Sequence, residues 1–195
     1  MPTSLPLNDR LSPARQNHGL FSDHVLDQVV PRHPHWEDGV AEAEAFLAWL
    51  RRRYARERRF LADYRDRGLE GHWFRPILRN LGHTFAPEPA LPGFESDDER
   101  PDYVFFPDEA ARREVEEASN RSALAEKALA VGEVRRWDTA LGKKPWAGGP
   151  GFGDQNPSWQ IGQLCAAAGV EWGLLSNGRL WRLVNRDTAA RLDTY

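Results

Sequence analysis

The chain has 195 residues, a formal net charge of −3, and 41% hydrophobic and 28% charged residues. This composition is ordinary for a globular protein, and the length suits one α/β domain with a sizeable core. The single cysteine, Cys165, excludes an internal disulfide and fits a reducing cytoplasm. The sequence shows neither an apolar run long enough to span a membrane nor the apolar core of a signal peptide. Because the overall charge is acidic, any contact with nucleic acid must come from a local basic cluster.

The N-terminal third is predicted to be helical after a proline-containing leader over residues 1–35. A short helix is expected over Phe21–Val30, and a long one over Val40–Arg67 that stops at Gly68. The long helix carries a basic cluster with two interpretations. It either contacts DNA phosphates, or it is a solvated face balanced by nearby acidic residues. The cluster consists of Arg51, Arg52, Arg53, Arg56, Arg58 and Arg59.

The remaining elements follow from periodicity and from turn residues. In chain order they are a helix over Gly71–Leu81, irregular near Pro76; a strand over His83–Pro87; a loop over Leu91–Arg100; a buried strand over Asp102–Phe106; a helical insertion over Asp108–Ala128; a strand over Leu129–Arg135; a glycine-rich loop over Lys143–Asp154; a helix from Asn156 to Gly169; and a hairpin of Val170–Ser176 and Arg179–Asn185 around Asn177-Gly178.

Two of the predicted strands each carry a carboxylate. Asp102 opens one apolar strand and Glu133 lies within another. Burial of a carboxylate is costly unless it is paired, and two neighbouring carboxylates repel each other. A hard divalent cation such as Mg²⁺ or Mn²⁺ resolves both problems. The sequence therefore predicts a metal site able to act on phosphate.

At these residues the chain resembles the PD-(D/E)XK nuclease superfamily. Within it, the pattern is most similar to the N-terminal nuclease domain of type IIG restriction-modification enzymes and related defence methylases. Five segments carry the resemblance along nearly the whole chain: Leu20-Phe21-Ser22-Asp23-His24, Pro101-Asp102, Glu133-Val134-Arg135, Asn156-Pro157-Ser158-Trp159-Gln160, and the hairpin from Val170 to Trp181.

The resemblance implies an α/β restriction-endonuclease-like core, with a central mixed β-sheet flanked by helices, over residues 36–195. It implies that Asp102 and Glu133 bind Mg²⁺ or Mn²⁺, with the Val134 carbonyl as a third ligand. Arg135 stands where the family has Lys, which keeps the positive charge but removes a possible base. Gln160 is expected to orient the metal-bound water or to bond the Glu133 strand. Glu70 corresponds to an extra acidic residue that some members carry on their first core helix.

The implied activity is Mg²⁺-dependent endonucleolytic hydrolysis of double-stranded DNA in restriction-modification or phage defence. The alternatives are an inactive nuclease-fold module that binds DNA or assembles with a methyltransferase, and an unrelated α/β protein. The chain stops directly after the predicted hairpin, and no Asn-Pro-Pro-Tyr motif is present. From the resemblance we expect a longer polypeptide, with a methyltransferase region following this one.

Overall fold

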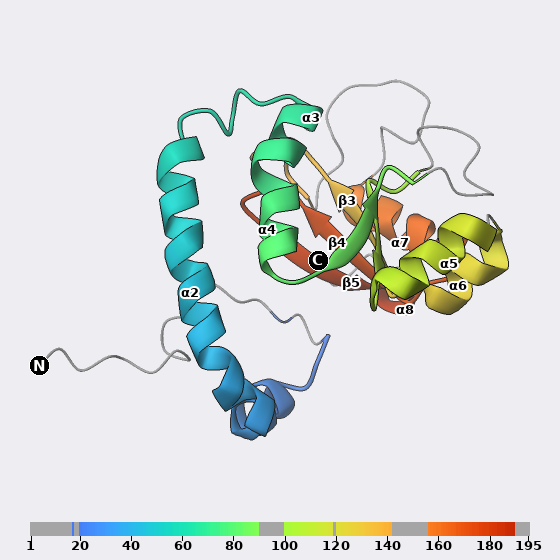
Figure 1. Ribbon diagram of the computed structural model, residues 1–195, viewed down its shortest axis with the longest axis horizontal. Helices are drawn as coiled ribbons and strands as arrows, with labels where there is room; N and C mark the ends of the chain where they lie inside the picture. Colours follow the sequence, from blue (N-terminus) through green and yellow to red (C-terminus); the bar gives the residue numbers. More distant parts are fainter. Residues whose placement is uncertain (1–16, 18–19, 90–99, 119, 142–155, 190–195) are drawn as a thin grey trace, which may run out of the picture. The chain divides into compact units, whose positions relative to one another are not determined.

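A computed structural model of the chain describes residues 17, 20–89, 100–118, 120–141 and 156–189. It divides into two compact units (Figure 1). One comprises residues 1–49 with residues 194–195, and the other comprises residues 50–193. The predicted loops over Leu91–Arg100 and Lys143–Asp154 lie almost entirely outside the described residues, as do most of the predicted leader and the last residues of the chain.

The described part of the first unit is helical. A π-helical turn, η2 (Val25–Val29), leads into the 3₁₀ turn η3 (Val30–Arg32), which confirms the short helix predicted there. The long helix α2 spans Pro34–Glu57 and runs across the boundary between the units. The prediction that this helix reaches Arg67 is wrong. The chain turns after Glu57 and buries Leu61 completely, and Gly68 lies inside the short helix α3 (Asp66–Leu69) instead of ending α2.

The second unit is built on a five-stranded mixed sheet with the strand order β1-β2-β3-β4-β5. The β3 and β4 strands are parallel, and every other neighbouring pair is antiparallel. The strands are β1 (Thr84–Pro87), β2 (Tyr103–Phe106), β3 (Ala130–Val134), β4 (Trp172–Ser176) and β5 (Trp181–Asn185). Helices flank this sheet, as expected from the sequence.

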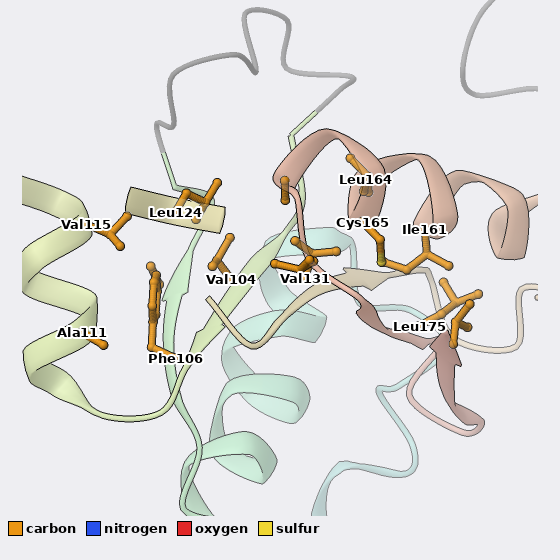
Figure 2. Close-up of a cluster of buried hydrophobic side chains, with 14 of the residues drawn as sticks. Val104, Phe106, Ala111, Val115, Leu124, Val131, Ile161, Leu164, Cys165 and Leu175 are labelled. Carbon is orange, nitrogen blue, oxygen red and sulfur yellow. The ribbon is translucent and has the colours of Figure 1, made fainter. Parts of the chain in front are cut away.

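The main core lies between the sheet and helices α5 (Glu109–Ala118), α6 (Arg121–Lys127) and α7 (Pro157–Ala168). Figure 2 shows Ile161, Leu164 and Cys165 of α7 packed over the strand residues Val131 and Leu175. A side chain in place of Gly173 would run into Ile161 and Cys165, so this glycine allows the close approach of α7 to β4.

The π-helical turn η4 (Glu70–Phe74) and the helix α4 (Arg75–Asn80) pack elsewhere on the sheet. Phe74 contacts the ring of Trp181 on β5, and Trp73 donates a hydrogen bond to the Gly178 carbonyl in the hairpin turn at 2.9 Å. η4 and α4 together form the predicted second helix, and Pro76 lies in the first turn of α4. β5 is an edge strand of the sheet, and 37% of Trp181 is exposed despite its contact with Phe74.

Local sequence signals account for the start of α5 and for both ends of α7. The Asp108 carboxylate accepts a hydrogen bond from the Ala111 amide at the start of α5, and Asn156 accepts one from the Ser158 amide at the start of α7. At the other end of α7, Gly169 has a φ of 75°, the left-handed conformation of a helix C-terminus. The caps therefore set the length of α7, and with it the position of the residues in its first turn.

Candidate active site

The register of β2 and β3 brings the two predicted acidic residues together. Tyr103 lies opposite Gly132, and Val104 lies opposite Val131. Extending this register by one residue places Asp102 opposite Glu133, on the same face of the sheet. The Val134 amide donates a hydrogen bond to Asp102 Oδ2 at 2.7 Å. The Asp102 carboxylate is therefore held at the end of β3, beside the second acidic residue.

Glu133 is a buried carboxylate with one unsatisfied oxygen. The residue is only 8% exposed, and its Oε1 accepts a hydrogen bond from Arg135. Its Oε2 is buried and has no hydrogen-bond partner among the described residues. Burial raises the pKa of Glu133, although the positive charge of Arg135 acts in the opposite direction. An unpaired buried carboxylate oxygen is costly, so this oxygen marks a place where a cation would be stabilising.

The pKa of Asp102 rises to about 8, first because of burial and then because of the neighbouring negative charge of Glu133. The hydrogen bond from the Val134 amide opposes this shift without cancelling it. A buried carboxylate whose proton affinity is raised by a neighbouring carboxylate lies in a negative electrostatic field, and such a field also favours a divalent cation.

Arg135 joins β3 to α7. Its Nη1 donates to Glu133 Oε1 and to the Val134 carbonyl, the latter at 3.1 Å, and its Nη2 donates to Gln160 Oε1 at 2.6 Å. Gln160 is in the first turn of α7 and only 6% exposed. The sequence-based prediction gave Gln160 a metal-bound water or the Glu133 strand as partner, and in the structure it accepts a hydrogen bond from Arg135, which directly follows that strand.

Glu70 forms a third acidic position beside this pair. It is 4% exposed, and its Oε2 accepts hydrogen bonds from Arg75 Nη2 at 2.8 Å and from the Tyr103 hydroxyl at 2.9 Å. The roles of Arg75 and Tyr103 are missing from the sequence-based prediction. The spacing of residues along the chain gave no sign of these roles. Tyr103 in particular follows Asp102 in a strand whose other residues are apolar and buried, so it resembles an ordinary core residue.

These groups surround a pocket of about 430 Å³. The pocket combines acidic groups, two arginines and an apolar wall. Its lining residues are Leu69, Glu70, Phe74, Asp102, Val134, Arg135, Arg136 and Thr139. Of the sequence-predicted site residues, Asp102, Arg135 and Glu70 line the pocket directly, and Glu133 and Gln160 are bonded to Arg135 behind it.

The oxygen atoms at this site are of the chemical type that Mg²⁺ and Mn²⁺ prefer as ligands. Asp102 and Glu133 provide carboxylate oxygens, Val134 provides a carbonyl oxygen, and the unpaired Glu133 Oε2 is a ligand atom without a partner. Within the described residues, however, no group of three or more His, Cys, Asp or Glu side chains is arranged to hold a metal ion. A cation here would therefore depend on two carboxylates, the carbonyl and water.

No protein-family model, curated protein or solved structure matches this chain. The described helices include none that is both long and apolar enough to cross a membrane.

Proposed function

We propose that the protein is the nuclease domain of a restriction-modification or phage-defence enzyme, with a PD-(D/E)XK fold, and that it hydrolyses DNA phosphodiester bonds with Mg²⁺ or Mn²⁺. The observation that carries the proposal is the pairing of Asp102 with Glu133 at the end of two adjacent strands, where one buried carboxylate oxygen has no partner. The strand order and the packing of α7 on β3 and β4 agree with this assignment.

In this proposal each residue has a separate role. Asp102, Glu133 and the Val134 carbonyl hold the cation, which when bound polarises the scissile phosphate and lowers the pKa of a coordinated water. Arg135 offers the phosphate two parallel N–H donors and a permanent positive charge, but it does not accept a proton. Gln160 orients Arg135 through its 2.6 Å hydrogen bond. Glu70, held by Arg75 and Tyr103, adds negative charge at the wall of the pocket.

The basic segment, residues 51–67, supports DNA as the substrate. It contains eight arginines and three acidic residues, a net charge of +5 in a chain whose total is −3. Arg51, Arg52 and Arg56 are exposed and form no ion pair with any described residue. Arg53 donates two hydrogen bonds to the carbonyl of His72 in η4, the element that also carries Glu70. The segment is therefore attached directly to the element that forms one wall of the pocket.

A second candidate function is an inactive nuclease-fold module that binds DNA or assembles with a methyltransferase. The observation in its favour is Arg135 itself, which replaces the Lys of the family pattern and pairs with Glu133 in place of a metal. An inactive module would keep the fold, the basic segment and DNA binding, but would not cleave DNA with any divalent ion.

Nicking of supercoiled plasmid DNA with and without Mg²⁺ or Mn²⁺ distinguishes the two functions. We expect metal-dependent cleavage by the wild type and none by Asp102→Ala. The matched control is Glu117→Ala, which removes an exposed carboxylate of α5, outside both the carboxylate pair and the basic segment, and should cleave normally. Absence of cleavage by the wild type with every divalent ion, and by Arg135→Lys as well, would favour the inactive module.

DNA binding is tested separately in the Asp102→Ala background, so that cleavage does not interfere. Arg51→Gln with Arg52→Gln should weaken binding and reduce the slope of log K against log salt by about 1.8, since each lost phosphate contact contributes about 0.9. The matched control is Arg113→Gln with Arg121→Gln, two exposed arginines of the α5–α6 region. Equal loss of slope in both double variants would argue against a specific role for the basic segment.

A further inference from the structure

We infer that the guanidinium of Arg135 acts as an internal cation in the proposed metal site, and that a divalent ion binds only when this side chain moves away. The inference rests on the proposed function and adds a step to it, because metal binding becomes a competition with a residue of the same chain. Arg135 would then control when the site is loaded, in addition to contacting phosphate.

The contacts of Arg135 carry this inference. Its Nη1 donates to Glu133 Oε1 and to the Val134 carbonyl oxygen, and these are two of the three protein ligands assigned to the metal. Its Nη2 is held by Gln160 at 2.6 Å. The planar guanidinium fork contacts three oxygens at once, whereas the compact ammonium of a lysine reaches fewer of them in a fixed geometry.

The charges in the site explain why the two cations exclude each other. Glu133 is buried and needs a positive neighbour, which Arg135 provides in the structure. A divalent ion on Glu133 Oε2 and the Val134 carbonyl would share the same carboxylate and the same carbonyl with the guanidinium, and like charges at that distance repel strongly. The protein therefore has two alternative ways to neutralise this carboxylate, and each displaces the other.

The surroundings of Arg135 leave room for the displaced side chain. Its side chain is 26% exposed, and the residue lines the 430 Å³ pocket. Movement toward the pocket separates the guanidinium from Glu133 without burying its charge. In that position it faces the space where a DNA phosphate would bind, and phosphate is a strong bidentate partner for arginine.

The test is calorimetric titration of Mn²⁺ into the full chain without DNA. If the displaced conformation is populated at about 1–10% in the wild type, Arg135→Gln should bind Mn²⁺ about 10–100-fold more tightly. Arg136→Gln is the matched control, since it removes the same charge from the same pocket but no hydrogen bond to Glu133 or Val134. It should change the affinity much less. Gln160→Ala, which releases one side of the guanidinium, should give an intermediate increase.

The outcomes separate this inference from the proposed function. Equal Mn²⁺ affinity in the wild type and Arg135→Gln, with loss of binding in Glu133→Gln, would leave the metal site standing and overturn the competition. A similar increase in Mn²⁺ affinity in Arg135→Gln and Arg136→Gln would mean that only net charge matters. This result would also overturn the competition. Failure of every variant to bind Mn²⁺ would overturn both proposals. If Arg135→Gln does not fold, Arg135→Lys and Gln160→Ala provide the same comparison.

Discussion

Replacement of Tyr103 by phenylalanine tests whether Glu70 is held as a buried carboxylate. Tyr103 is 1% exposed, and its hydroxyl donates to Glu70 Oε2 at 2.9 Å. The variant keeps the aromatic ring, so the packing against Phe85 and Phe105 is retained and no large cavity forms. The variant loses the hydrogen bond to Glu70, which is itself 4% exposed, and the interaction of the hydroxyl with Arg75.

The expected magnitude follows mainly from the lost hydrogen bond to Glu70. A hydrogen bond to an ionised group is worth about 1.5–3 kcal/mol, and the upper part of the range applies where the remaining partner is buried. For a chain of this size, each kcal/mol lowers Tm by about 2–4 °C, so Tm should fall by roughly 3–12 °C. Arg75 still bonds Glu70 in the variant, which keeps the loss from being larger.

Urea unfolding followed by circular dichroism measures the loss of stability, and Tyr64→Phe is the matched control. Tyr64 donates to Glu57 at 2.8 Å, but both residues are only half-buried, so the same deletion should cost less than about 1 kcal/mol. Equal losses in the two variants, or no loss in Tyr103→Phe, would refute the claim that burial makes the Glu70 network strong.

Three further predictions concern the carboxylate pair and Arg135. Mg²⁺ at about tenfold above its Kd should stabilise the wild type by about 1.4 kcal/mol and leave Asp102→Ala unchanged, and equal thermal shifts would contradict the site. Glu133→Gln should abolish plasmid cleavage because an amide is a poor ligand for a hard metal ion. Arg135→Lys should keep or raise cleavage. Cleavage by Glu133→Gln would exclude this carboxylate as a metal ligand. The pKa of Asp102 is raised to about 8 from about 3.9 in a free aspartate, so the folded state binds more protons between these values and loses stability as pH rises through this range. Asp102→Asn should therefore stabilise the metal-free protein more at pH ~8 than at pH ~5 in urea unfolding, and a pH-independent difference would contradict the shift.

Short-range sequence signals predicted much of the secondary structure of the second unit. Asn156, Pro157 and Gly169 predicted both ends of α7, and Asn177-Gly178 predicted the hairpin of β4 and β5. Caps and tight turns depend on interactions over a few residues, so the sequence alone contains the information. The same reasoning failed for α2, which ends at Glu57, shortly before the completely buried Leu61, because burial depends on tertiary packing and not on neighbouring residues.

The candidate site likewise combines features that the sequence predicts with features that only the tertiary structure creates. Sequence motifs selected Asp102 and Glu133, but only the strand register placed them opposite each other. The bond from Tyr103 to Glu70 joins residues 33 positions apart, and the bond from Arg135 to Gln160 joins residues 25 positions apart. Such contacts depend on how helices pack on the sheet, and the spacing of residues along the chain does not encode that packing directly. The sequence therefore selected the groups that we propose to carry the chemistry, and tertiary structure decided which of them neutralise one another.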